Sequence, residues 1–192
     1  MNRTGSRRRR LAPWLLALAV AAVVPAGCSD DTVGPLGEAA AAPRPACFET
    51  DAGGALTKHV GTFTPPENLR LLGLQLDGAA GVEEVEPVVL PFGGNPAVTG
   101  TFLRYPPGSG VIADSLMRWS QRQPLADAIV TEADGQLAVL VGLRLTDAHE
   151  DGHIEGFQIE YADADGEEFS RGYPGRLILK AVGSVCTAAD YD

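Results

Sequence analysis

The side chains in this 192-residue chain best suited to bind a metal or act as nucleophiles are three histidines and three cysteines. Two histidines lie close together, at His149 and His153, with Glu150, Asp151 and Gly152 between them. On a helix, histidines at this spacing share a face and can bind zinc. Asp151-Gly152 favours a turn, however, so we expect the histidines to flank a polar loop. Metal binding there remains an open alternative.

Other stretches with a catalytic or ligand-binding pattern are weak. Gly108-Ser109-Gly110 lacks the flanking pattern of a nucleophile elbow. Lys58 and His59 are adjacent, but nothing in the sequence places a serine beside them. Asp163–Glu168 is acidic like a calcium loop, but two of that motif's ligand positions are unsuitable, and Asp165-Gly166 favours a hairpin turn. We therefore predict no catalytic residue, no cofactor and no resident metal.

The first 27 residues have the order of a secretory signal peptide. An apolar run from 11 to 26 ends in small residues, and its 16 residues fall short of the roughly 20 that a membrane-spanning helix needs. The run follows a basic patch made of Arg3, Arg7, Arg8, Arg9 and Arg10.

The end of this segment, Ala26-Gly27-Cys28, resembles the lipobox of bacterial lipoproteins. Pro25 stands where that family usually has an aliphatic residue. The resemblance implies that Cys28 becomes the first residue of the mature protein and carries lipid. It further implies a membrane partner and an extracytoplasmic location. Stable anchoring generally needs two lipid signals, which such a modification supplies.

If lipid occupies Cys28, the odd cysteine count is explained, and Cys47 and Cys186 remain. Compartments outside the cytoplasm are oxidising, so we predict a disulfide between these two residues. A shared metal site is the alternative, although two thiolates without a nearby histidine are a poor ligand set.

The charge balance excludes nucleic acid as a partner. The chain has 15 Lys and Arg against 25 Asp and Glu, and five of its arginines lie in the first 27 residues, which hold no acidic residue. Residues 28–192 therefore carry ten basic and 25 acidic residues, a formal net charge of −15. Phosphate backbones are bound by basic surfaces, and this one is strongly acidic.

The organisation of the chain follows from composition. We predict a signal peptide over 1–27, a small-residue and Pro-rich flexible tether over 28–46, and one domain over 47–192. The domain's short apolar runs are bounded by Gly, Pro, Asn and Asp, a pattern typical of strands. A helical spacing is found over 111–121, which includes Trp119, and we expect that residue to be a core plug that covers the open end of the sandwich. Strands are predicted over 68–76, 82–90, 98–105, 136–146, 154–161, 167–172 and 176–182. Alternating apolar residues over 136–146 and 154–161 predict one buried and one wet face. Pro87 confines the strand over 82–90 to an edge or a bulge.

These strands predict an all-β fold, an immunoglobulin-like or related Greek-key antiparallel sandwich of seven to eight strands with one short helical connection. A small barrel is the alternative. The predicted function is a lipid-anchored, non-catalytic module that binds an unknown protein or small molecule or supports the envelope. The alternatives are an exported metal or small-ligand carrier and a hydrolase whose site is built from scattered carboxylates and histidine.

Overall fold

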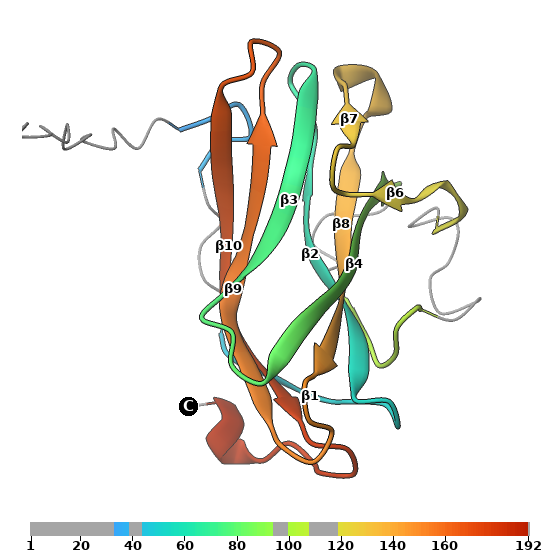
Figure 1. Cartoon of the computed structure of the whole chain (residues 1–192), viewed down its shortest axis with the longest axis vertical. Coiled ribbons are helices and arrows are strands. Elements are labelled where there is room, and N and C mark those ends of the chain that lie inside the picture. Colours follow the sequence, from blue (N-terminus) through green and yellow to red (C-terminus); the bar gives the residue numbers. More distant parts are fainter. Residues whose placement is uncertain (1–32, 39–43, 94–99, 108–118, 192) are drawn as a thin grey trace, which may run out of the picture. The chain divides into compact units, whose positions relative to one another are not determined.

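The computed structural model describes residues 33–38, 44–93, 100–107 and 119–191, and it is a two-layer β-sandwich (Figure 1). The short 3-10 helices among these residues are η1 (Trp119–Gln121), η2 (Glu132–Asp134) and η3 (Ala188–Tyr191). The strands are β1 (Ala46–Glu49), β2 (Ala55–Phe63), β3 (Leu69–Asp77), β4 (Val82–Pro91), β5 (Thr101–Phe102), β6 (Gln123–Pro124), β7 (Ile129–Val130), β8 (Leu137–Leu145), β9 (Gly152–Ala162) and β10 (Glu168–Lys180).

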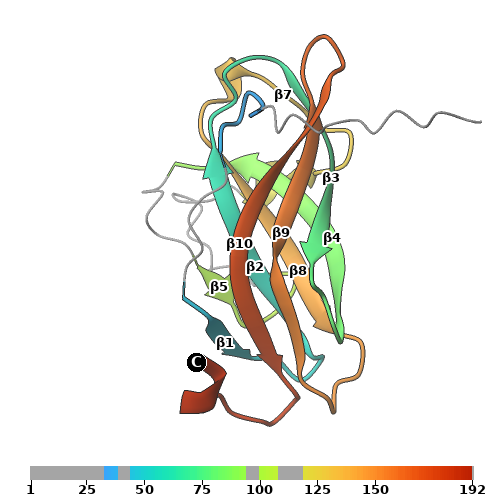
Figure 2. The ribbon, with the colours of Figure 1, turned by 90° about the vertical axis from the view of Figure 1, so that its left-hand side faces the viewer.

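The strands form two sheets in the described residues. One sheet has the order β1-β10-β9-β3-β7, and the other has the order β5-β2-β8-β4-β6. Figure 2 shows β10 and β9 of the first sheet lying across β2 and β8 of the second. All pairings are antiparallel except that of β1 with the end of β10, which is parallel. The predicted antiparallel sandwich is confirmed.

The hairpin β9–β10 follows the predicted pattern of alternation. Phe157, Ile159 and Tyr161 are buried in the core between the sheets, whereas Gln158 and Glu160 face the other side of the sheet. The turn contains Gly166 at φ 84°, a left-handed conformation that glycine adopts without steric cost. The strands predicted over 167–172 and 176–182 are one strand, β10, interrupted by a bulge between Pro174 and Leu177.

Proline in β4 has the predicted effect on the ladder. The register of β4 against β8 shifts between Val85 and Val88, and Glu86 adopts φ 41° there. Pro87 lacks an N–H and therefore lies in a bulge rather than in the regular ladder.

The outer face of the second sheet is apolar, which corrects one expectation. The alternation in β8 predicted one buried and one wet face, yet Ala138 and Leu140 are also completely buried. They belong to a second apolar cluster with Val88, Leu90 and Phe92 of β4. Phe102 and Trp119 pack against this cluster from the connection between β4 and β8. This connection covers the outer face at Ala138 and Leu140, whereas Arg144 further along β8 remains exposed.

The helix predicted over 111–121 falls largely outside the described residues, and Trp119–Gln121 form the short η1. Trp119 packs against the outer cluster of the second sheet rather than in the core between the sheets. Trp119 is therefore not part of the core between the sheets, which the predicted role as a core plug required.

The compact unit begins at Val33, ahead of the predicted domain start at residue 47. Leu36 is 7% exposed and joins the core between the sheets, and its N–H donates to the Tyr161 hydroxyl at 3.2 Å. Ala46 already lies in β1. A single leucine in a polar, Pro-rich stretch shows no hydrophobic periodicity, so the sequence gives no signal that Leu36 is buried. The predicted signal peptide lies outside the described residues.

Candidate functional site

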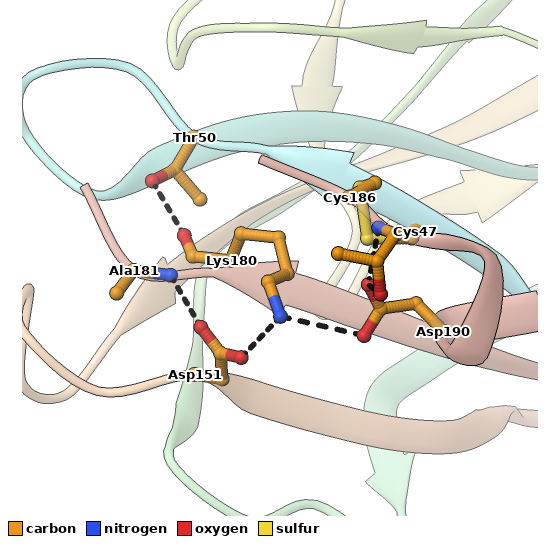
Figure 3. A network of polar contacts seen from close by, with 8 residues as sticks. Cys47, Thr50, Asp151, Lys180, Ala181, Cys186 and Asp190 are labelled. Atoms are coloured by element: carbon orange, nitrogen blue, oxygen red, sulfur yellow. Dashed lines mark hydrogen bonds and ion pairs between the residues drawn. A yellow bond between two sulfur atoms is a disulfide. The ribbon is translucent and has the colours of Figure 1, made fainter. Parts of the chain in front are cut away.

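The predicted disulfide lies where the first and last strands meet. Cys47 in β1 pairs in register with Ile178 of β10, and the chain after β10 turns back to bring Cys186 beside it (Figure 3). The two Cα atoms are 5.9 Å apart, and the structure joins the sulfur atoms in a disulfide. This agrees with the predicted pairing, and the Cα separation is within the usual range for a disulfide.

A partly buried ion-pair network lies beside the disulfide. The side chain of Lys180 is 13% exposed, and its Nζ donates to Asp151 Oδ2 at 2.5 Å and to Asp190 Oδ1 at 3.3 Å (Figure 3). The other oxygen of Asp151 accepts the Ala181 N–H at 2.8 Å. Thr50 Oγ1 donates to the carbonyl of Lys180 at 3.0 Å. Lys180 thus joins the start of β9, the end of β10 and η3.

The pKa values in this network shift as expected of paired charges. The hydrogen bond to Asp151 is the largest factor that raises the pKa of Lys180, and the same bond lowers the pKa of Asp151. The pKa of Asp190 is lowered first by the backbone N–H of Thr187 and more weakly by Lys180. Each charged form is stabilised by its partner, so the network acts as a structural clamp.

We expect Lys180→Met to loosen the C-terminal segment. Without the ammonium group, the carboxylates of Asp151 and Asp190 face each other uncompensated, and like charges repel. Hydrogen–deuterium exchange at the Asp190 amide, which donates to the carbonyl of Thr187 at 3.1 Å, should then be several-fold faster.

The control for this change is Arg144→Met, which breaks the half-exposed ion pair with Glu83 in the other sheet. That variant should leave exchange at Asp190 unchanged. Equal exchange rates in the Lys180→Met variant and the wild-type protein would contradict a clamp.

The two histidines of the 149–153 segment are held differently from each other. His149 is exposed in a turn, where its backbone N–H donates to Asp147 Oδ1 at 2.9 Å. His153 is in β9, and its backbone pairs with Ala80. Across the part of the chain that the structure describes, no three His, Cys, Asp or Glu side chains come together as metal ligands.

The acidic segment after β9 is a turn. Asp163 Oδ1 accepts the N–H groups of Asp165 and Glu167, each at 2.9 Å. This carboxylate therefore stabilises the tight turn of the β9–β10 hairpin.

His59 is a buried titratable residue that sequence reasoning did not place in a strand. It lies in β2 and is 1% exposed, and its ring stacks on Phe92 with the centroids 5.8 Å apart. Neither ring nitrogen has a hydrogen-bond partner among the described residues. Burial is the main cause that lowers the pKa of His59 to about 4, the charge of Lys58 lowers it further, and the backbone of Gly61 opposes the shift. His59 is therefore neutral at pH 7.

The segment before η1 is fastened across this face by two contacts. Thr57 Oγ1 donates to the carbonyl of Arg104 at 2.7 Å, and the Tyr105 hydroxyl donates to Glu86 Oε2 at 2.8 Å. The Tyr105 ring crosses β8 at Gly142, where a Cβ would approach the ring to 2.7 Å. The burial of His59 thus results from packing that the local sequence does not encode.

Comparison with known proteins adds no family to this description. No protein-family model matches the chain, and no curated protein matches it. Among the described residues, no helix is both long enough and apolar enough to cross a membrane. Cys28, the predicted lipid attachment residue, lies outside the described residues.

Proposed function

We propose that this chain is an exported lipoprotein, anchored in a membrane by lipid on Cys28, with a β-sandwich that serves as a non-catalytic binding or envelope-structural module outside the cytoplasm. The observation that carries the proposal is the disulfide between Cys47 and Cys186. Disulfides persist in oxidising compartments. This pairing leaves Cys28, at the end of the lipobox-like segment, as the one remaining cysteine of the chain.

The geometry of the described polar groups supports a module without catalysis. A nucleophilic mechanism needs a nucleophile within hydrogen-bond reach of its base. The ring of His59 faces Phe92, and the neighbouring hydroxyl of Thr57 is already donated to the carbonyl of Arg104. Lys180 is held in ion pairs with two carboxylates, Asp151 and Asp190. These groups favour stability and a fixed surface over reaction chemistry.

We expect a clickable fatty acid, fed to bacteria that express the full chain, to label the wild-type protein and to leave Cys28→Ser unlabelled. The reason is that a thioether to diacylglycerol requires the thiol at position 28. The measurement is in-gel detection of the label on the purified protein. Cys186→Ser is the matched control and should keep its label. An unlabelled wild-type protein, or a labelled Cys28→Ser variant, would show that the anchor is not at this residue.

A further inference from the structure

Three polar side chains gather on the inner face of β9 and β10. Arg171 and Tyr173 are alternate residues of β10 and therefore share this face. Tyr161 of β9 pairs in register with Phe169, two residues before Arg171. The guanidinium carbon of Arg171 lies 5.1 Å from the centroid of the Tyr173 ring. Arg171 itself pairs with Ile159, so Tyr161 and Arg171 are diagonal neighbours across the β9–β10 pair.

Each of these groups has a donor without an acceptor in the described residues. Arg171 Nε and the Tyr173 hydroxyl are buried atoms that have no hydrogen-bond partner there. The Tyr161 hydroxyl accepts the N–H of Leu36, so its own proton remains to be donated. Tyr173 is only 8% exposed and Tyr161 is fully buried. Buried donors that lack acceptors are rare in folded proteins and call for a physical explanation.

The charge of Arg171 is also uncompensated. Arg171 forms no ion pair with any described residue, although residues 28–192 have a formal net charge of −15. By contrast, Arg176 on the same strand pairs with Glu155 at 3.7 Å. The acidic residue Glu168 directly precedes Phe169 in β10, so its side chain faces the opposite side of the sheet. The inner face therefore presents a cation and two hydroxyls.

Both hydroxyls stay protonated at neutral pH. Burial is the largest effect on each, and it raises the pKa of Tyr161 and of Tyr173, while Arg171 acts in the opposite direction. A protonated phenol donates a hydrogen bond to an anion.

The site lies at an edge of its sheet and beside two aromatic contacts. Arg171 is partly exposed, and in the described residues no strand pairs with Glu168–Pro174 on the side away from β9. Phe169 stacks on Tyr161 with ring centroids 5.7 Å apart. Gly61 of β2 approaches the Tyr173 ring so closely that a Cβ there would overlap it.

We propose that Arg171, Tyr173 and Tyr161 form a binding site for the carboxylate of a small organic acid. The planar guanidinium offers paired N–H donors that match the two oxygens of a carboxylate. One cation with two neutral donors balances a single negative charge better than the two charges of phosphate. This site specifies the class of ligand for the binding role proposed above. The carboxylate binding itself is independent of that role, and only its biological purpose rests on it.

The test is a titration of the full-length protein in mild detergent with benzoate, followed by NMR of the arginine Nε–H groups. We expect benzoate to shift the Arg171 signal saturably, with benzamide, its uncharged analogue, having no such effect. Inorganic phosphate should bind at least tenfold more weakly than benzoate. No saturable shift up to about 10 mM benzoate, an equal response to benzamide, or phosphate binding as tight as benzoate binding would overturn the proposal.

Variants locate the site. Tyr173→Phe keeps the packed ring and removes only the hydroxyl, so it should fold and weaken benzoate binding severalfold, whereas Arg171→Gln should weaken it at least tenfold. Arg176→Gln, on the same strand, is the matched control and should bind as the wild-type protein does. Unchanged binding in Tyr173→Phe, or equal losses in Arg171→Gln and Arg176→Gln, would place the anion elsewhere. Because this readout does not involve Cys28, its failure is distinct from a failure of acyl labelling.

Discussion

Replacement of Cys47 and Cys186 by serine is expected to lower the free energy of unfolding by about 5 kcal/mol. The two cysteines are 139 residues apart in sequence, and in the chain-entropy model a loop of this size restricts the unfolded state by roughly that amount. For a domain of this length, the same loss lowers the melting temperature by about 10–20 °C. Urea unfolding at pH 7, followed by Trp119 fluorescence, measures the change.

Two controls separate the cross-link from other effects of substitution. Cys28→Ser removes a thiol without touching the disulfide and should unfold at the wild-type urea concentration. Reduction of the wild-type protein should add two hydrogens to the intact mass and reproduce the unfolding curve of the double variant. A double variant as stable as the wild-type protein would mean that the bond does not restrict the unfolded chain.

Acidification from pH 6.5 to pH 4 is expected to cost about 3 kcal/mol of stability through His59 alone. In the folded protein the pKa of this residue is about 4, whereas an unperturbed histidine has a pKa of 6.5. Between these values the unfolded chain binds a proton that the folded chain does not, so stability falls as pH falls. A difference of this size in pKa corresponds to about 3 kcal/mol. Stability from this residue is complete above pH 6.5 and lost near pH 4.

His59→Leu tests this effect, because leucine fills a buried apolar position without a proton to bind. The difference in unfolding free energy between this variant and the wild-type protein should change by about 3 kcal/mol, in favour of the variant, when the pH falls from 7 to 4. His149→Gln is the control, since His149 is exposed and its removal should leave the pH dependence nearly unchanged. Parallel pH profiles for His59→Leu and the wild-type protein would contradict the linkage.

The strands that sequence analysis predicted are those with a strong local pattern. For three features, the pattern that specifies the structure lies within about ten residues. They are the alternating apolar residues of β9, the apolar run of β8 and the turn at Asp165-Gly166. Pro87 marked the bulge in β4 for the same reason, since a missing N–H acts locally. The pairing of Cys47 with Cys186 was predicted from the cysteine count and from the oxidising compartment that the signal-like segment predicts, rather than from any pattern of strands.

The missed features depend on contacts between distant segments. β2 contains Lys58, His59 and Gly61, which interrupt the apolar alternation, and it is a strand because β8 lies beside it. Gly61 is needed there because the Tyr173 ring occupies the space of a side chain. The wet face predicted for β8 is covered by residues that follow β4. Neither fact can be read from a local window of sequence.

The candidate carboxylate site was missed for a related reason. Arg171 alternates with Phe169 and Tyr173, and in a sequence an arginine at such a position is indistinguishable from one that points to solvent. Only the register of β9 against β10 places Tyr161 next to it. Among the described residues Arg171 has no acidic partner, and this is likewise a property of the assembled sheets, because the chain as a whole has acidic residues in excess.

The bond between the first and last strands also governs what a protease can remove. A single cut at any peptide bond between Phe48 and Val185 leaves one fragment that ends beyond Cys47 and another that begins before Cys186, and the disulfide holds them together. A single proteolytic cut between these residues would therefore release no fragment of the domain. Only a cut on the amino-terminal side of Cys47 breaks the covalent link between residue 28 and the disulfide-bonded part of the chain. Under the proposed lipid anchor, cleavage in that stretch alone would release the domain from the membrane.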